Sequence, residues 1–357
     1  MTQVIVCCGA GGTGKTTTAA AIGVKLAIQG QRVAVLTIDP AKRLADALGL
    51  GSLDNDPKSV SLTELNARGT LHALMLDRKA TFDAMVIAHS PNPDVAERLL
   101  ANAYYQAVST RLTGLHEYMA TEKLQQLVES GLWDVVVLDT PPTQHAIDFF
   151  HAPERVGRLF EHGVLATLMT PARGLVGVAT RRAVGLLERL AGESVLHDIA
   201  EFFRLISGLS EIIRSRNMQV HALLRSDRTR FYQVTAPALD ACEEVEGFAS
   251  LLREQGMRLE GLLVNRVTPV PQFTAPLVRE RLPEAPLGVP DEEWDTMANA
   301  LLALIPRAEA RAQQHERAIV ALKRSAHTEV WKLPELPAGV RTIDTLAGLG
   351  PHLPPLL

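Results

Sequence analysis

The first forty residues alternate apolar runs with turns, a pattern typical of buried parallel strands. Residues 4–8 are apolar and lead into Gly9, and residues 32–38 are apolar and stop at the Asp39-Pro40 pair. Between them, residues 16–28 are rich in alanine, which favours a helix that ends near Gly30. The order strand, glycine-rich loop, helix and strand forms a βαβ unit. The pattern therefore predicts an α/β fold with a mostly parallel sheet flanked by helices.

Further apolar runs predict the rest of this sheet. Strands are expected over residues 71–76, 133–138, 232–235, 259–264 and 329–333. Helices are expected over residues 239–255 and from Ile343 onward.

Two long stretches carry helical rather than strand patterns. The first covers residues 79–130 and breaks at Ser90-Pro91-Asn92-Pro93, and the second covers residues 153–225. Within the second, apolar residues at spacings of three and four predict one face of a single helix: Leu196, Ile199, Phe203, Ile206, Leu209 and Ile213. Such a stripe is more often core than a client-binding surface. We expect one domain over residues 1–357, with residues 79–130 and 153–225 forming a helical subdomain inserted in it.

Composition and charge narrow the function classes. The chain has 357 residues, 46% of them apolar, and a formal net charge of −4, so no global charge attracts it to nucleic acid or anionic lipid. A local basic stretch is either a solvated helix face or a contact for an acidic partner or a membrane surface: Arg173, Arg181, Arg182 and Arg189. No leader pattern and no apolar run of about 18 residues occur, so we expect a cytoplasmic protein.

Three cysteines occur in the chain. Cys7 and Cys8 lie next to each other in a predicted buried strand, and Cys242 lies far from them in sequence. For the adjacent pair, packing in the core is favoured over a disulfide or a metal site.

The loop after the first strand matches G-x-x-x-x-G-K-[ST], in the context of a strand before it and a helix after it. The residues expected to bind nucleotide here are Gly9, Ala10, Gly11, Gly12, Thr13, Gly14, Lys15, Thr16 and Thr17. Glycines allow backbone N–H groups to converge on phosphate oxygens, and the helix N-terminus adds positive potential. Lys15 is expected to reach the β- and γ-phosphates, and the Thr16 hydroxyl to ligate Mg²⁺. ATP and Mg²⁺ are the predicted cofactors.

Two aspartates follow predicted strands and complete a candidate site. Asp139 ends an apolar strand, as a residue that holds Mg²⁺ directly or through water would, and its alternative role is a helix or turn cap. Asp39 follows the second strand and can orient the attacking water and accept its proton. A turn-forming Asp-Pro pair is the alternative for Asp39.

Together these residues resemble the arsenical-pump ATPase family, which includes targeting factors for tail-anchored membrane proteins. The matching segments, in the family's order, are GAGGTGKTTTAAA, LTIDPAKRLADALG, WDVVVLDTPPTQHAIDFF, GLLVNR and VWKLPELPAGV. They extend over nearly the whole chain, so the resemblance concerns the complete P-loop NTPase fold of the deviant-Walker type.

The resemblance implies a nucleotide-driven dimer with ATP at the subunit interface. It implies that Asp39 is the catalytic switch aspartate and that Asp139 belongs to the metal site. Asn265 matches the residue that recognises adenine, although it would otherwise be an ordinary turn former at a strand end. Pro334 and Leu336 fall in the loop that covers the adenine ring. In relatives, helices inserted at corresponding places form an apolar groove controlled by nucleotide, so a hydrophobic client protein is a candidate partner.

Three departures from the family pattern change the expected partner and ligand. Ala10 occupies the place of the signature lysine that reaches the partner's ATP, a cation comparable to an arginine finger. The chain is therefore expected either to pair with a related ATPase that keeps this lysine, or to form a slowly hydrolysing homodimer. Gln144 replaces a glycine of the second switch. No C-x-x-C and no cysteine triad occur, so neither a zinc clasp nor an arsenite site is expected.

The leading interpretation is a Mg-dependent ATP hydrolase that couples its nucleotide state to the helical subdomain. One alternative is a partitioning-type ATPase that acts on membrane or DNA, which the net charge and the C-terminal sequence GLGPHLPPLL disfavour. Another is an ATP-binding regulatory subunit of a heterodimer. A small-molecule kinase is least favoured, because no acceptor-binding signature is visible.

Overall fold

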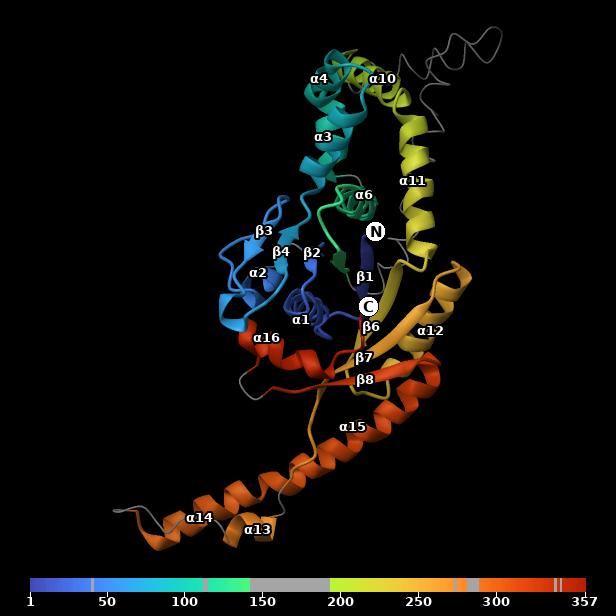
Figure 1. The fold of residues 1–357 in the computed structure, drawn as a ribbon. Coiled ribbons are helices and arrows are strands. Elements are labelled where there is room, and N and C mark those ends of the chain that lie inside the picture. The colour runs from blue at the N-terminus through green and yellow to red at the C-terminus, as the bar shows by residue number, and fades with distance from the viewer. Residues whose placement is uncertain are drawn as a thin grey trace.

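A central sheet of eight strands organises the protein (Figure 1). The computed structural model describes residues 1–39, 42–111, 115–141, 193–272, 275–280, 289–336, 339–340 and 342–357, and all structural statements concern these residues. The strand order is β3-β4-β2-β5-β1-β6-β7-β8, with every ladder parallel except that between β3 and β4. The strands are β1 Gln3–Cys8, β2 Arg32–Thr37, β3 Lys58–Val60, β4 Thr70–Met75, β5 Val135–Asp139, β6 Thr229–Thr235, β7 Leu259–Val267 and β8 Glu329–Pro334. The predicted α/β fold with a mostly parallel sheet is confirmed.

Both faces of the sheet are covered, so its strands are apolar on both sides. In β1, Ile5 and Cys7 face one core and Val4, Val6 and Cys8 face the other. The first core is closed by α1 (Lys15–Ile28), α2 (Arg43–Ala47) and α16 (Ile343–Leu349). The second is closed by helices that include α6 (Leu115–Glu129), α11 (Ser210–Arg225) and α12 (Ala241–Glu254). A third, smaller core joins α12 and α15 (Leu304–Ala326) to β7. Short 3-10 turns occur at Thr63–Leu65 and Gly350–His352.

Small side chains let α1 lie close to the sheet. Its alanines are completely buried, and a Cβ atom at Gly23 would come within 2.7 Å of a methyl carbon of Val35. The C-terminal tail lies against the same helix, because the Lys25 ammonium donates to the carbonyl oxygens of Leu353 and Pro354 at 2.9 Å. The helix that follows the glycine loop is thus held on both sides.

The adjacent cysteines are free thiols in the core, as predicted. Both are 0% exposed, and they point into the two different cores because they are neighbours in one strand. Burial raises the pKa of the Cys8 thiol to about 12. Burial also raises the pKa of the Cys7 thiol well above its ordinary value.

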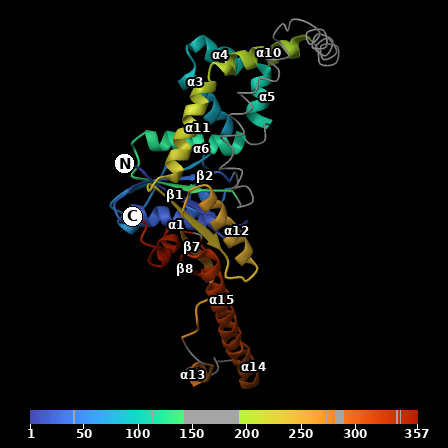
Figure 2. The same cartoon turned by 90° about the vertical axis from the view of Figure 1, so that its right-hand side faces the viewer.

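Helices extend from the second face of the sheet, in the upper part of Figures 1 and 2. They are α3 (Arg78–His89), α4 (Pro93–Ala101), α5 (Ala103–Arg111), α6, α10 (Glu193–Ser207) and α11. The expected break falls between α3 and α4, where Asn92 caps the second helix by accepting a bond from the Val95 N–H. The helix α10 packs on α4 and α5, and α11 packs on α6. That residues 79–130 and 153–225 form one inserted subdomain stays a prediction, because residues 142–192 lie outside the described part of the chain. This range also contains Gln144 and the basic stretch of Arg173, Arg181, Arg182 and Arg189.

The apolar stripe over residues 196–213 does not lie on a single helix, and this expectation was wrong. The helix α10 ends at Ser207 and α11 begins at Ser210, so the stripe turns at Gly208, a residue that disfavours a helix interior. Ile206, Leu209 and Ile213 are each 1% exposed and belong to the core. The residues of the stripe described as buried are thus packing residues.

A second extension arises between β7 and β8, where no element is predicted. This segment contains α13 (Ala275–Glu280), α14 (Asp291–Leu302) and α15, and it projects away from the sheet on the side opposite α4 and α10 (Figure 2). The helices α14 and α15 follow each other with only Ala303 between them. Pro306 explains this interruption, because its ring lacks an N–H and clashes with the carbonyl of Leu302. None of the described helices is both long enough and apolar enough to cross a bilayer.

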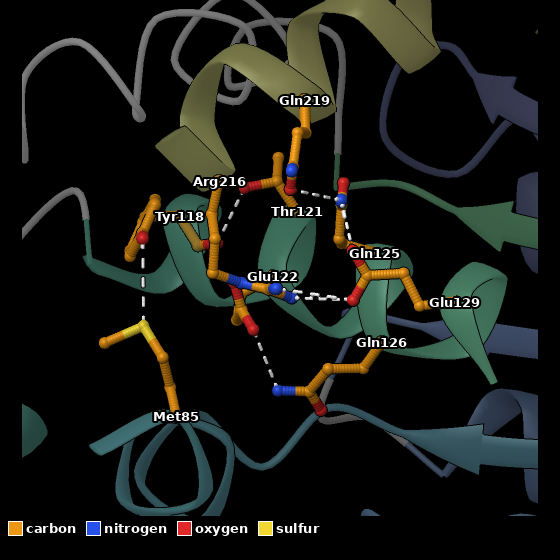
Figure 3. Close-up of polar contacts among 9 residues, drawn as sticks. All are labelled: Met85, Tyr118, Thr121, Glu122, Gln125, Gln126, Glu129, Arg216 and Gln219. Atoms are coloured by element: carbon orange, nitrogen blue, oxygen red, sulfur yellow. Dashed lines mark hydrogen bonds and ion pairs between the residues drawn. The ribbon is translucent and has the colours of Figure 1, made fainter. Parts of the chain in front are cut away.

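A buried ion pair joins the two chain segments of the upper helices (Figure 3). The Arg216 guanidinium of α11 donates to the Glu122 carboxylate of α6 at 2.7 Å and to Glu129 at 3.3 Å. The Glu122 side chain is 1% exposed and that of Arg216 10%. Gln125 adds a bond from its amide to Gln219 of α11 at 3.0 Å. Because both charges are withdrawn from water, each depends on the other.

We predict that Arg216→Met destabilises the protein by about 3–5 kcal/mol, since it leaves the Glu122 carboxylate buried without its cation. The double variant Arg216→Met with Glu122→Leu should recover most of this loss. Arg214→Met is the matched control on the same helix, where the Arg214–Glu211 pair is exposed and contributes about 0–1 kcal/mol. Urea unfolding measures all the values. Equal effects of the Arg216 and Arg214 substitutions would contradict the prediction.

Candidate active site

The glycine-rich loop joins the carboxyl end of β1 to the first turn of α1. Gly9, Gly12 and Gly14 have φ values of 147°, 80° and 96°, in a region that side chains disfavour. A Cβ atom at Gly9 would lie 2.0 Å from the Val234 carbonyl oxygen, and one at Gly14 would lie 2.1 Å from the amide nitrogen of Asn265. The loop conformation therefore requires glycine at both positions.

Side chains of the loop and of the first helical turn bond to the loop backbone. The Ala10 carbonyl oxygen accepts hydrogen bonds from the Lys15 ammonium at 2.8 Å and from the Thr13 hydroxyl at 2.9 Å. Burial lowers the pKa of Lys15, and the nearby Asp139 carboxylate acts in the opposite direction. A cation and the N-terminus of a 14-residue helix thus meet at one point, which favours an anion there.

Asp139 lies where β5, β2 and α1 meet. Its Oδ2 accepts hydrogen bonds from the hydroxyls of Thr16, at 2.7 Å, and Thr37, at 2.9 Å. The residue is 1% exposed, and burial raises the pKa of its carboxyl to about 6. Its Oδ1 is buried without a hydrogen-bond partner. A carboxylate and hydroxyls form the oxygen donor set that suits Mg²⁺, and an orphaned carboxylate oxygen beside them fits such an ion.

Asp39 lies just beyond β2, close to the same cluster. Its backbone N–H donates to the Thr37 hydroxyl at 3.3 Å, so Thr37 links the two aspartates. The Asp39 carboxylate forms an ion pair with Arg43 of α2, with 3.6 Å between the nitrogen and the oxygen. The Asp39 side chain is 33% exposed, which leaves it accessible from solvent.

These elements enclose a cavity of about 630 Å³, within the range of about 300–1,000 Å³ usual for small-molecule sites. Its described walls include Gly11, Gly12, Gly14, Lys15, Thr16 and Thr17 on one side, Asp39, Arg43, Asp46 and Ala47 on another, and Thr140, Pro141, Arg266 and Val340. The cavity thus adjoins the carboxyl ends of β1, β2 and β5, the edge at which parallel sheets bind ligands.

The residues predicted to contact adenine lie at the rim of this arrangement. The Asn265 amide donates to the Thr13 carbonyl oxygen at 2.8 Å, and its oxygen accepts from the Arg266 N–H. Pro334 ends β8 next to Val267, and Leu336 packs at the edge of the core beneath α1. Asn265 is therefore brought to the loop, while adenine recognition by it, by Pro334 and by Leu336 stays a prediction.

Several residues of the site were not anticipated from sequence. Thr37 is a polar residue at the buried end of an apolar strand, a signal that could have been used. Arg266 follows Asn265 and has a φ of 58°, in the left-handed region that is uncommon for side chains other than glycine. Arg43 enters the cavity from the start of α2, four residues after Asp39, whereas Val340 reaches it from near the end of the chain.

A profile described as anion-transporting ATPase matches residues 2–282. The chain belongs to this family. Relatives include "ATPase ARSA2" of Chlamydomonas reinhardtii, 24% identical over 267 residues, which are 72% of this chain and 66% of the relative. "Putative arsenical pump-driving ATPase 2" of Aquifex aeolicus (strain VF5) is 24% identical over 265 residues, 73% and 79% of the two chains. "ATPase ASNA1 homolog" of Cryptosporidium parvum is 27% identical over 259 residues, 72% and 63%.

Membership in the family confirms the resemblance found in the sequence. The chain spans slightly less than two thirds of the length of the algal and Cryptosporidium relatives.

We predict that Asp139→Asn stabilises the protein at pH 7.5 without nucleotide or Mg²⁺, by about 1–2 kcal/mol, because it removes a buried charge. A raised pKa means that the folded state binds the proton more tightly than the unfolded chain. The destabilisation is then absent below the ordinary pKa of 3.8 and grows as the pH rises to about 6. Denaturant unfolding at several pH values measures it.

Asp134→Asn is the control for this prediction. The Asp134 carboxylate lies just before the same strand, and the Arg32 guanidinium lowers its pKa. Its removal should change stability little and in the opposite direction. A less stable Asp139→Asn variant at pH 7.5 would contradict the interpretation.

Proposed function

We propose that this chain hydrolyses Mg-ATP to ADP and phosphate in the cavity at the N-terminus of α1. The observation that carries the proposal is the buried cluster of Thr16, Thr37 and Asp139, with its orphaned carboxylate oxygen beneath the glycine loop. Membership in a family of ATPases supports the same activity.

Each element of the site has a role in this reaction. Backbone N–H groups of the loop and the Lys15 ammonium hold the β- and γ-phosphates, while Thr16 and Asp139 hold Mg²⁺, directly or through water. The ion would supply positive charge to the phosphate oxygens as negative charge moves onto the leaving group. Asp39 orients the attacking water and accepts its proton. Water oxygen bonds to the γ-phosphorus, the bond to the β–γ bridging oxygen breaks, and its electron pair leaves with ADP.

The cellular context is proposed on the family pattern and on the residues of this chain. We infer a cytoplasmic dimer with ATP near the subunit interface, formed by two copies or by this chain and a related ATPase that carries the signature lysine absent at Ala10. An arsenite ligand is not favoured, because Cys7 and Cys8 are buried in different cores and Cys242 lies on α12. A hydrophobic client or partner protein that contacts the helices of residues 79–130 and 153–225 fits the proposal better.

We predict that Lys15→Ala abolishes ATP turnover, because among the described residues Lys15 is the cation that is bonded to the loop backbone. Steady-state phosphate release by the purified chain measures this. Lys58→Ala, on the edge strand β3, is the control and should behave like the unchanged protein. Turnover that survives Lys15→Ala would show that the hydrolysis comes from another protein or another site.

We also predict that ATP changes the amide hydrogen exchange rates of α10 and α11. In the proposed coupling, nucleotide binding changes the conformation of these helices. Asp39→Asn should hold ATP without hydrolysing it and serves as the trapped form. The helix α12, which packs on β6 and β7, is the internal control. Identical exchange of α10 and α11 with and without ATP would contradict the proposed coupling.

A further inference from the structure

One of the basic side chains that line the cavity, that of Arg43, lies where it could take part in hydrolysis. Arg43 is one of the residues that line the cavity, and it forms an ion pair with Asp39. We propose that the Arg43 side chain turns when ATP binds, so that its guanidinium leaves Asp39 and contacts the γ-phosphate. Arg43 then supplies, within one chain, the cation that Ala10 cannot provide. This inference rests on the proposed ATP hydrolysis and concerns the same site.

The charge balance of the cavity calls for a second cation. Hydrolysis moves negative charge across the γ-phosphate oxygens, and related enzymes meet this charge with a lysine of the loop plus a further cation. Here Lys15 is buried and held against the Ala10 carbonyl oxygen. Among the described residues of the cavity wall, the other cations are Arg43 and Arg266. Of these two, Arg43 is the one paired with Asp39, the proposed acceptor of the water proton.

The short helix α2 fixes the backbone of Arg43 while leaving its side chain exposed. Leu44 and Ala45 are 1% and 2% exposed and pack in the core beneath α1. The Arg43 side chain, by contrast, is 67% exposed. A long side chain on an anchored backbone can therefore turn within the cavity without moving the helix.

The pair of Arg43 with Asp39 is easily exchanged. Exposed ion pairs contribute little to stability. The distance of 3.6 Å between the Arg43 nitrogen and the Asp39 oxygen is also longer than that of a strong hydrogen bond. A γ-phosphate offers more negative charge than a carboxylate and accepts two parallel N–H bonds from a guanidinium. Bound ATP should consequently take the guanidinium from Asp39.

This exchange prepares both groups for the same step. The released Asp39 carboxylate can accept the proton of the attacking water, which a guanidinium partner would oppose. At the same time, Arg43 stabilises the negative charge on the γ-phosphate oxygens as the water oxygen bonds to phosphorus. The bond to the bridging oxygen breaks, its electron pair leaves with ADP, and the proton passes from Asp39 to solvent. ATP binding thereby switches the site from a resting to a reactive arrangement.

The test compares Arg43→Ala and Arg43→Lys with Lys42→Ala. Lys42 is the neighbouring exposed cation, and it is not among the described residues of the cavity wall. We expect Arg43→Ala to lower kcat by roughly 10³-fold, the scale of a lost arginine finger, with ADP affinity unchanged. Arg43→Lys should retain part of the rate, because an ammonium keeps the charge but not the two parallel bonds. Guanidinium ion, below denaturing concentrations, should restore part of the rate of Arg43→Ala.

A binding readout separates the transition state from the ground state. ADP with aluminium fluoride and Mg²⁺ mimics the transferring phosphoryl group, so it should raise the melting temperature of the wild type above the value with ADP alone. Arg43→Ala should lose this additional shift and keep the shift caused by ADP. Lys42→Ala should keep both.

Three results would overturn the inference. A wild-type kcat in Arg43→Ala would do so, and so would equal losses in Arg43→Ala and Lys42→Ala, which would indicate a local structural effect. A wild-type chain that binds ATP without turnover above Lys15→Ala would also overturn it, while the proposed ATP site would stand and need a lysine from a partner. Failure of the wild type to bind ATP would instead refute the proposed function itself.

Discussion

The burial of the Asp139 carboxylate is the constraint on which the site depends. A charge withdrawn from water is unfavourable unless donors surround it, and here the donors come from Thr16 at the start of α1 and Thr37 at the end of β2. These bonds need β2 next to β5, and the N-terminus of α1 above both. The sheet order and the position of the first helix are therefore coupled to this one carboxylate. Its orphaned Oδ1 leaves unfavourable energy in the ligand-free fold, as functional sites often do.

The surrounding structure keeps this arrangement rigid. Gly23 and the alanines of α1 allow the helix to touch the sheet, and the C-terminal tail holds it through Lys25. On the other side, Asn265 at the end of β7 is bonded to the loop backbone through Thr13. Segments from both halves of the chain thus converge on one loop. Loose attachment at any of them would move the groups of the loop that surround the cavity.

The upper helices are connected to the site through the strands that follow them. The helix α6 leads into β5, which ends at Asp139, and α11 leads into β6, which lies beside β1. Arg216 and Glu122 lock α6 to α11 in a buried pair that cannot be opened without a large loss of stability. These two helices are consequently expected to move as one body. That provides a physical route by which a change at Asp139 could reach the helices farthest from the cavity.

Local sequence patterns determined the elements with strong periodicity and the loop between β1 and α1. Apolar runs ending in Gly9, Asp39 and Asp139 were sufficient to predict strands, because a strand buried on both faces has few alternatives. The loop motif was equally clear, since its glycines are demanded by backbone geometry at Gly9 and Gly14. The family, too, could be recognised from these segments.

Tertiary structure alone decided which distant residues meet. Nothing in the local pattern around Thr37, Arg43 or Arg266 states that they approach the same loop, because that depends on the strand order and on the direction of each crossover. The helix break at Gly208 and the interruption at Ala303 between α14 and α15 were also not predicted, since helical periodicity continues across both. The sequence by itself therefore determined the strands, the phosphate loop and its lysine. The partners of Asp139, which are Thr16 and Thr37, were decided by packing, which joins residues that are far apart along the chain.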